Sequence, residues 1–314
     1  MRQSGVQHRR RIDLLLAGSA LAGVCVAAGC SSPAAPAPAA DGSHRAVTPS
    51  ASRAPTSSPT PPRPSPTPTP PPAPHVTVSR VRMADGSIVT VAAFRGPVQY
   101  VLHNGSGDPG PLAAGRVTAG PAVGAAERPR LLAAFNGGFK LSAGAGGYEQ
   151  EGHVIATLRT GLASLVIDRS GQARIGIWGH NLPAPNEAVY SVRQNLQPLV
   201  YHGQPTAASA DWGLWGATLG GGEYVARSAV GQDGYGDLLF AGGASTSPAD
   251  LAAALASRGA RIAMELDINP EWVQLDIAAA PGGPLTAAIP GQVRSASQFL
   301  SGWTRDFFTV LGPS

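Results

Sequence analysis

Short runs of apolar residues alternate with polar ones along the chain from Val76 onward. Runs of this kind predict β-strands, and glycine, aspartate or proline separates one run from the next; the run at 261–268 also has a strict two-residue period. Two of the separators, at 168–171 and 232–236, have the composition of hairpin turns. The strands predicted in this way cover residues 75–81, 87–94, 98–103, 131–135, 153–159, 162–168, 173–178, 223–231, 237–243 and 261–268.

One helix is predicted, at residues 248–258, and it carries the usual signals of a helix start and end. These are an N-cap serine, a proline, an acid in the first turn and a terminal glycine: Ser247, Pro248, Asp250 and Gly259. With the strands at 238–241 and 261–268, the helix predicts a strand–helix–strand crossover, which normally leaves its strands parallel. We therefore expect an α+β fold, a β-rich single domain with a mixed sheet and at least one such crossover.

Residues 1–29 have the layout of an export signal. Arginines precede an apolar run that is too short to span a membrane, and small residues follow it. The tetrapeptide Ala-Ala-Gly-Cys at 27–30 resembles a bacterial lipobox, although Ala27 stands where leucine is usual. The resemblance implies cleavage before Cys30, acylation of its sulfur, and a lipid anchor on the extracytoplasmic face of the membrane. An ordinary signal peptide cut near Ala28, or an uncleaved anchor, is the alternative.

Residues 30–75 differ in composition from the rest of the chain. Between residues 31 and 75 lie 15 of the chain's 30 prolines, with serine, threonine and alanine among them. This composition predicts an extended, disordered linker. We interpret it as a spacer between a membrane and a domain at residues 76–314, and a proline-rich docking ligand is the alternative.

Cysteine usage and charge exclude several classes of function. Cys25 and Cys30 are the only cysteines, and the first would leave with the signal while the second carries lipid. The mature domain would then have no disulfide, thiol nucleophile or cysteine metal ligand. Of the net charge of +4, residues 1–29 hold +3 and residues 30–75 hold +2, which leaves −1 for the domain. No basic footprint for nucleic acid is therefore expected there.

The strand predicted at 261–268 ends in an unusual concentration of polar groups. In the sequence ARIAMELDINPEW, two acids, Glu265 and Asp267, and the amide of Asn269 alternate with apolar residues, and Pro270 stops the strand. A regular strand would place both carboxylates on one face. Two carboxylates at the end of a strand suit acid–base or nucleophilic work.

Two other stretches carry candidate binding groups. The strand at 131–135 breaks at Asn136-Gly137-Gly138, where glycines allow close approach of a ligand and outward-turned N–H groups. Arg227 lies in a strand amid small residues, and its planar guanidinium suits phosphate or carboxylate. A tight turn is the alternative for the glycines, and a surface or salt-bridged residue is the alternative for Arg227.

Metal and cofactor chemistry receives no support from the sequence. The histidines His153, His180 and His202 lack ligand spacing, so no metal site and no cofactor is predicted, and metal dependence stays open. The sequence also has no GxSxG, HExxH or Walker motif. Four large aromatic residues suit either the core or the stacking of a sugar: Tyr148, Trp212, Trp215 and Trp272.

The order of these motifs over residues 77–310 resembles the phosphodiester glycosidase family. Its Asn-Gly-Gly matches residues 136–138, its Arg-Thr/Ser-Ala-Ile/Val-Gly matches residues 227–231, and its Leu-Asp matches Leu266 and Asp267. The family usually continues Gly-Gly-Gly-Ser after the acid, whereas this chain reads Ile-Asn-Pro-Glu at 268–271. This departure puts the family's substrate, and catalysis itself, in question for this chain.

The resemblance implies hydrolysis of a sugar-1-phosphate diester at the anomeric carbon, on a carbohydrate or glycosyl-phosphate of the cell envelope. Asp267 would be the nucleophile or base, Glu265 the second acid and Arg227 the phosphate clamp. Asn136, with the glycines Gly137 and Gly138, would bind the substrate. Two alternatives are a non-catalytic module that binds glycan or phosphodiester polymer, and a structural envelope protein. The alternative to these residue roles is that Glu265 and Asp267 pair with Arg227 in a buried network.

Overall fold

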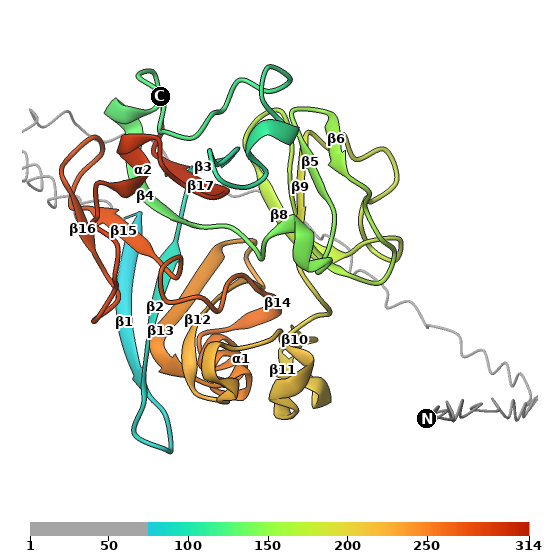
Figure 1. Cartoon of the computed structure of the whole chain (residues 1–314), viewed down its shortest axis with the longest axis vertical. Coiled ribbons are helices and arrows are strands. Elements are labelled where there is room, and N and C mark those ends of the chain that lie inside the picture. The colour runs from blue at the N-terminus through green and yellow to red at the C-terminus, as the bar shows by residue number, and fades with distance from the viewer. Residues whose placement is uncertain (1–74, 314) are drawn as a thin grey trace, which may run out of the picture. The chain divides into compact units, whose positions relative to one another are not determined.

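The computed structural model describes residues 75–313, which form three β-sheets and two short α-helices (Figure 1). The predicted export signal, Cys30 and the predicted linker up to residue 74 lie outside these residues. The helices are α1 (Pro248–Ser257) and α2 (Gln298–Ser301). Neither has the length and apolar character that a membrane-spanning helix needs.

All three sheets are built from antiparallel strand pairs. The largest has the order β1 (Val76–Arg82), β2 (Ile88–Phe94), β13 (Leu238–Thr246), β12 (Val225–Asp233), β14 (Ala260–Glu265), β10 (Val200–Tyr201) and β11 (Gln204–Pro205). The second has the order β16 (Leu285–Ala287), β15 (Leu275–Ala278), β4 (Leu131–Asn136), β17 (Phe307–Leu311) and β3 (Gln99–His103). The third has the order β6 (His153–Ala156), β5 (Tyr148–Gln150), β9 (Ser191–Gln194), β7 (Ala163–Ile167) and β8 (Ala173–Ile177).

Helix α1 connects β13 to β14 on one face of the largest sheet. Ser247 caps the helix, since its Oγ accepts from Asp250 N at 3.1 Å while the Asp250 carboxylate accepts from Ser247 N at 3.2 Å. Strands β13 and β14 run in the same direction, but β12 lies between them and is antiparallel to both. The prediction of a mixed sheet is therefore wrong, because the intervening strand leaves every ladder of the largest sheet antiparallel.

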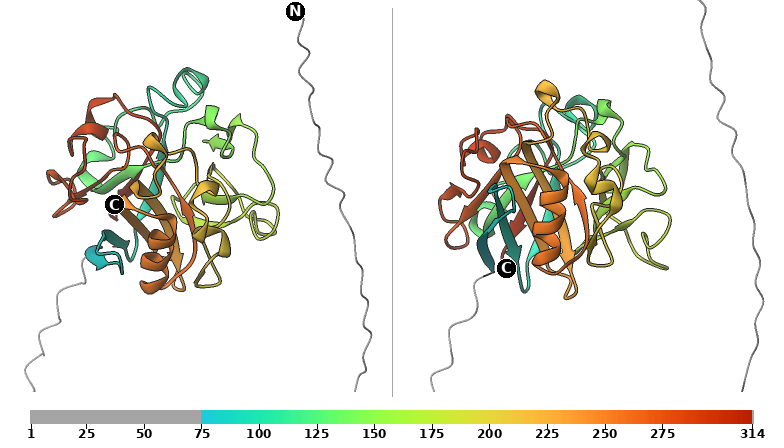
Figure 2. Two further views of the ribbon diagram at one scale, coloured as in Figure 1. Left: turned by 60° about the horizontal axis from the view of Figure 1, so that its bottom comes forward. Right: turned by 90° about the horizontal axis from the view of Figure 1, so that it is seen from below.

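The largest sheet is covered on both faces. One face packs against apolar residues of α1, among them Leu251 and Leu255. The right-hand view of Figure 2 shows the helix lying over the strands of this sheet. The other face packs against the two smaller sheets. At the centre of this second interface, the ring centroid of Phe135 on β4 lies 5.4 Å from that of Phe240 on β13 and 5.2 Å from that of Phe308 on β17. Burial of such side chains contributes about 1.5–3 kcal/mol each.

The two predicted hairpin turns are confirmed. Residues 168–171 lie between β7 and β8, and residues 232–236 cover the end of β12 and most of the turn to β13. Strand β14 ends at Glu265, three residues before the predicted end at 268, and the shorter strand changes the position of the acids that follow.

Candidate active site

Asn136 ends β4 and joins it to two other segments. Its Nδ2 donates to Ser228 Oγ on β12 at 2.9 Å, and its Oδ1 accepts from the backbone N of Gln274 at 3.0 Å. The side chain is 4% exposed. Because both ends of the amide have partners, Asn136 fixes the point where β4, β12 and the approach to β15 meet.

A bulge separates the two acids at the end of β14. Leu266 N donates to Ser228 O, and Ser228 N donates to Asp267 O, each at 2.8 Å, so two residues face one. In a regular strand Glu265 and Asp267 would share a face. The bulge instead leaves Glu265 on the α1 face of the sheet, with Ala263, and brings Asp267 toward β4.

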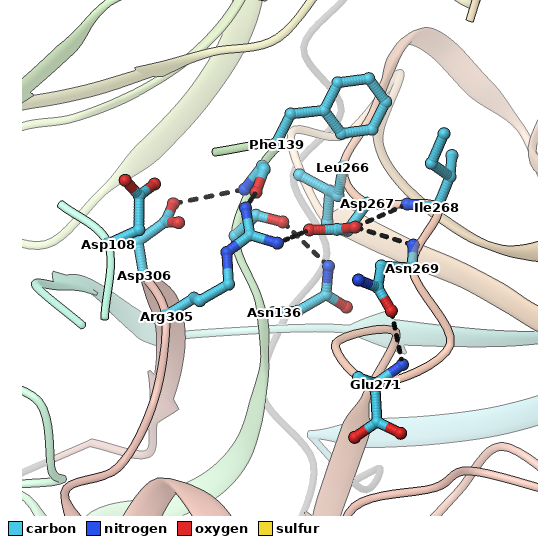
Figure 3. A network of polar contacts seen from close by, with 12 residues as sticks. Asp108, Asn136, Phe139, Leu266, Asp267, Ile268, Asn269, Glu271, Arg305 and Asp306 are labelled. Carbon is cyan, nitrogen blue, oxygen red and sulfur yellow. Dashed lines mark hydrogen bonds and ion pairs between the residues drawn. The ribbon is translucent and has the colours of Figure 1, made fainter. Parts of the chain in front are cut away.

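Asp267 is held by three donors (Figure 3). Its Oδ1 accepts from the backbone N of Ile268 at 2.8 Å and of Asn269 at 2.9 Å, and its Oδ2 accepts from Arg305 Nη1 at 2.5 Å. The Nη2 of Arg305 donates to the carbonyl of Gly138 at 2.8 Å. Burial raises the pKa of Asp267, while the Arg305 guanidinium and the two N–H groups oppose that rise.

The glycines of residues 136–138 lie against Asp306, which immediately precedes β17. Gly137 N donates to Asp306 O at 2.8 Å, and Gly138 N donates to Asp306 Oδ2 at 3.2 Å. Both N–H groups therefore have partners within the chain. The sequence had suggested that they turn outward to a ligand, and the structure does not place them in that way. A Cβ at Gly137 would lie 2.0 Å from Asp306 Oδ2, so glycine is needed here for close packing.

These residues border a small pocket with a cavity volume of about 10 Å³, roughly the room for one water molecule. Four of the six residues predicted for the site lie in its wall, together with the aromatic candidate Trp272 and four residues that were not predicted. Its lining consists of Asn136, Gly137, Gly138, Asp267, Trp272, Gln274, Phe299, Arg305 and Asp306.

The other two predicted site residues, Arg227 and Glu265, do not line the pocket. Arg227 Nη1 donates to Glu265 Oε1 at 2.8 Å, and both side chains are fully buried. The guanidinium also donates to the carbonyls of Trp215 and Glu223, both at 3.3 Å. Burial raises the pKa of Glu265, and Arg227 opposes that rise. The expected grouping of Arg227 and Glu265 with Asp267 in one cleft is therefore replaced by two separate ion pairs.

Sequence reasoning missed Arg305 and Asp306, which line the pocket, and Arg193, which pairs with Asp306. Arg193 Nε donates to Asp306 Oδ2 at 2.7 Å, and its other nitrogens donate to the carbonyls of Gln194 and Phe139. Arg305 stands beside Asp306 in the sequence. The sequence did contain a sign of these residues, because Arg305 and Asp306 form a charged pair directly before the apolar residues of β17. Asp267 was recognised from a similar change between apolar and charged residues near the end of β14.

The remaining candidates are distributed as follows. Within residues 75–313, no group of three or more His, Cys, Asp or Glu side chains is arranged to hold a metal ion. Tyr148 and Trp215 are fully buried in the core. Of the four aromatic candidates, Trp272 alone lines the pocket together with Asp267.

The structure aligns at low identity with two solved structures. One is the catalytic domain of zebrafish N-acetylglucosamine-1-phosphodiester alpha-N-acetylglucosaminidase, auto-inhibited by its pro-peptide, with 15% identity, a TM-score of 0.47, and coverage of 76% of this chain and 82% of that chain. The other is a hypothetical protein from Synechocystis, with 14% identity and a TM-score of 0.47, where 76% of this chain covers 62% of that one. No family model and no curated protein matches the chain. We therefore base the function on the residues of the pocket.

Proposed function

We propose that the chain hydrolyses a glycosyl-phosphate diester at the bond between the anomeric carbon and the phosphate, in the pocket between Asn136 and Asp267. The observation that carries the proposal is the Asp267–Arg305 pair in the pocket wall, where a buried carboxylate lies 2.5 Å from a guanidinium. A carboxylate is the group that attacks, or activates water against, an anomeric centre. A guanidinium is the group that stabilises a departing phosphate.

Arg305 takes the role of phosphate clamp that the sequence had given to Arg227. Its Nε has no hydrogen-bond partner within residues 75–313, so a donor remains for a phosphate oxygen. When Arg305 turns its other donors to the phosphate, Asp267 Oδ2 becomes free to act as nucleophile or base. Glu265 and Arg227 support the sheet behind the pocket as a buried pair.

The experiment is an assay of the full chain with the methyl phosphodiester of N-acetylglucosamine 1-phosphate. Asp267→Asn keeps the shape of the side chain and removes its nucleophilic charge, so turnover should fall by at least 100-fold, as for other essential carboxylates. Asp85→Asn, on an exposed turn between β1 and β2, is the matched control and should keep full activity. Normal turnover by Asp267→Asn would remove the basis of the proposal.

One observation favours a second candidate, a module that binds the diester without cleaving it. Both oxygens of Asp267 already have partners, and Pro270 stands in the segment where the family has glycines. A substrate must displace Arg305 before the carboxylate is free. Saturable binding of the diester by the unmutated chain, with no release of N-acetylglucosamine, would select this function over hydrolysis.

We also propose that the chain is exported and held on the extracytoplasmic face of the membrane by lipid on Cys30, where it would meet envelope glycans. The support is the lipobox-like tetrapeptide at 27–30 after a short apolar run. The proline-rich segment that follows would act as the spacer between anchor and domain.

A further inference from the structure

An exposed indole stands beside the pocket. Trp303 is 56% exposed, although it lies two residues before the buried Arg305. Its ring centroid is 5.7 Å from that of Trp272, with 46° between the planes, and Trp272 itself lines the pocket. A large aromatic side chain that faces solvent at the edge of a pocket is typical of a binding surface.

The two rings are held in place from within the chain. The guanidinium carbon of Arg294 lies 4.5 Å from the ring centroid of Trp303 and 5.2 Å from that of Trp272. Arg294 is fixed in turn by Glu271, with an ion pair of 2.6 Å and a bond of 3.2 Å from Nε to the Glu271 carbonyl. Rings supported in this way lose little freedom when a ligand stacks on them.

The same rings connect to the acid. The guanidinium carbon of Arg305 lies 5.6 Å from the ring centroid of Trp272, and Arg305 is the partner of Asp267. A continuous path therefore leads from the exposed Trp303 through Trp272 to the carboxylate. Each guanidinium along this path is already paired with a carboxylate, Arg294 with Glu271 and Arg305 with Asp267, so an anionic ligand would compete with those carboxylates.

We propose that Trp272 and Trp303, supported by Arg294, form an aromatic platform that binds the sugar ring of a glycosyl phosphate while the phosphate reaches Arg305. The axial C–H bonds of a pyranose make an apolar face that matches an indole, and the ring hydroxyls stay in water. The proposal rests on the proposed function, because the platform is the sugar subsite of the same pocket. The occupant of the platform is a sugar ring, because Trp272 lies against Arg305, the arginine proposed to bind the phosphate of the same ligand.

The test measures binding by quenching of tryptophan fluorescence in full chains that carry Asp267→Asn, so that turnover does not interfere. The probes are the methyl phosphodiester of N-acetylglucosamine 1-phosphate and dimethyl phosphate, which lacks the sugar. Trp303→Ala should weaken binding of the sugar diester about tenfold, in the range expected for an aromatic stacking contact, and leave dimethyl phosphate unchanged. Trp303→Phe should restore most of the binding. Trp212→Ala, away from the pocket lining, is the matched control.

The outcomes separate the platform from hydrolysis. If Trp303→Ala weakens sugar binding but the unmutated chain cleaves nothing, the platform stands and hydrolysis fails. If the unmutated chain cleaves the diester and Trp303→Ala leaves KM unchanged, hydrolysis stands and the platform is overturned. Conversion of a dimer to a monomer by Trp303→Ala, with sugar binding unchanged, would assign the surface to a second copy of the chain and also overturn the platform.

Discussion

Arg305 joins Asp267 to the glycine segment of the pocket. Its Nη1 donates to Asp267 Oδ2 at 2.5 Å, and its Nη2 donates to the carbonyl of Gly138 at 2.8 Å. A planar guanidinium makes both bonds at once because its donors are fixed in a fork. Arg305 therefore links the carboxylate directly to the segment after β4, beside a second link that runs from Asn136 through Ser228 Oγ to the backbone N of Asp267.

Arg305→Lys should impair the pocket while it keeps the charge. An ammonium group is a point charge and cannot reproduce the fork to both partners, so Asp267 would lose its fixed position. We expect kcat/KM for the diester to fall at least tenfold, with a small change in melting temperature. Arg261→Lys, on the exposed part of β14, is the matched control and should retain full activity. Unimpaired catalysis by Arg305→Lys would show that the fork is not needed.

The buried pair of Arg227 and Glu265 should act on stability instead. Glu265→Ala leaves a buried guanidinium without its carboxylate, which should lower the free energy of unfolding by about 3–5 kcal/mol. The double variant Arg227→Met with Glu265→Leu removes both charges and should recover most of that stability. Urea unfolding measures both effects.

The same double variant separates support from catalysis. If Arg227 and Glu265 only support the sheet, the folded double variant should cleave the diester at a rate close to that of the unmutated chain. A stable double variant without activity would return both residues to the reaction, as second acid and phosphate clamp.

Much of the site was accessible from the sequence because it lies at the ends of strongly apolar strands. Asn136 ends β4 and its two glycines follow it, and Asp267 lies two residues after the end of β14, so a change from apolar to polar residues marked each place. The sequence could not predict on which side of the sheet each side chain lies. The alternation predicted that Glu265 would stand beside Asp267, but the bulge opposite Ser228 depends on pairing between β12 and β14, which alternation does not encode.

The missed Arg305 and Asp306 stand directly before β17, a strand that was not predicted. Strand β17 is buried along its whole length between β3 and β4, so its sequence, FFTVL, is a continuous apolar run. The Arg305-Asp306 pair before it therefore had no predicted strand end to mark it. The prediction of a mixed sheet failed because the sequence does not show which strands are neighbours. It placed the strands on either side of α1 next to each other, whereas β12 lies between β13 and β14.

Gly137→Ala tests the close packing of β4 against Asp306. The new Cβ would lie 2.0 Å from Asp306 Oδ2, so the carboxylate and its partner Arg193 must move. We expect a loss of about 1–3 kcal/mol in the free energy of unfolding, as for other overpacked sites. Gly222→Ala, with nothing within 4 Å of its Cβ position and no left-handed backbone angle, is the matched control. Equal stability of the two variants would contradict the packing argument.

Cys30→Ser tests the anchor. If Cys30 carries lipid, its replacement by serine should block processing or release the chain from the membrane fraction. Cys25→Ser is the matched control, since this residue lies in the apolar run that would be removed. Membrane fractionation and mass spectrometry of the mature N-terminus provide the measurement, and an unmodified N-terminus downstream of Cys30 would refute the lipid anchor.

Asp276 should make the stability of the domain depend on pH. The side chain is fully buried on β15, and its partners are amides: Gln274 Nε2 at 2.5 Å from Oδ2 and Gln292 Nε2 at 2.8 Å from Oδ1. Burial raises the pKa of Asp276 from 3.8 to about 6, and the two amides oppose part of the rise. Between these values the folded chain keeps a proton that the unfolded chain has lost.

The contribution of Asp276 should therefore fall as pH rises from about 4 to about 6, by about 3 kcal/mol in total. Asp276→Asn removes this titration, and the Gln274 side chain can turn its oxygen toward the new amide. At pH 4 the variant and the unmutated chain should have similar free energies of unfolding in urea. At pH 7.5 the variant should be the more stable, because the unmutated chain must hold a buried carboxylate beside two neutral amides. A difference between the two chains that stays the same from pH 4 to pH 7.5 would show that Asp276 does not titrate in this range.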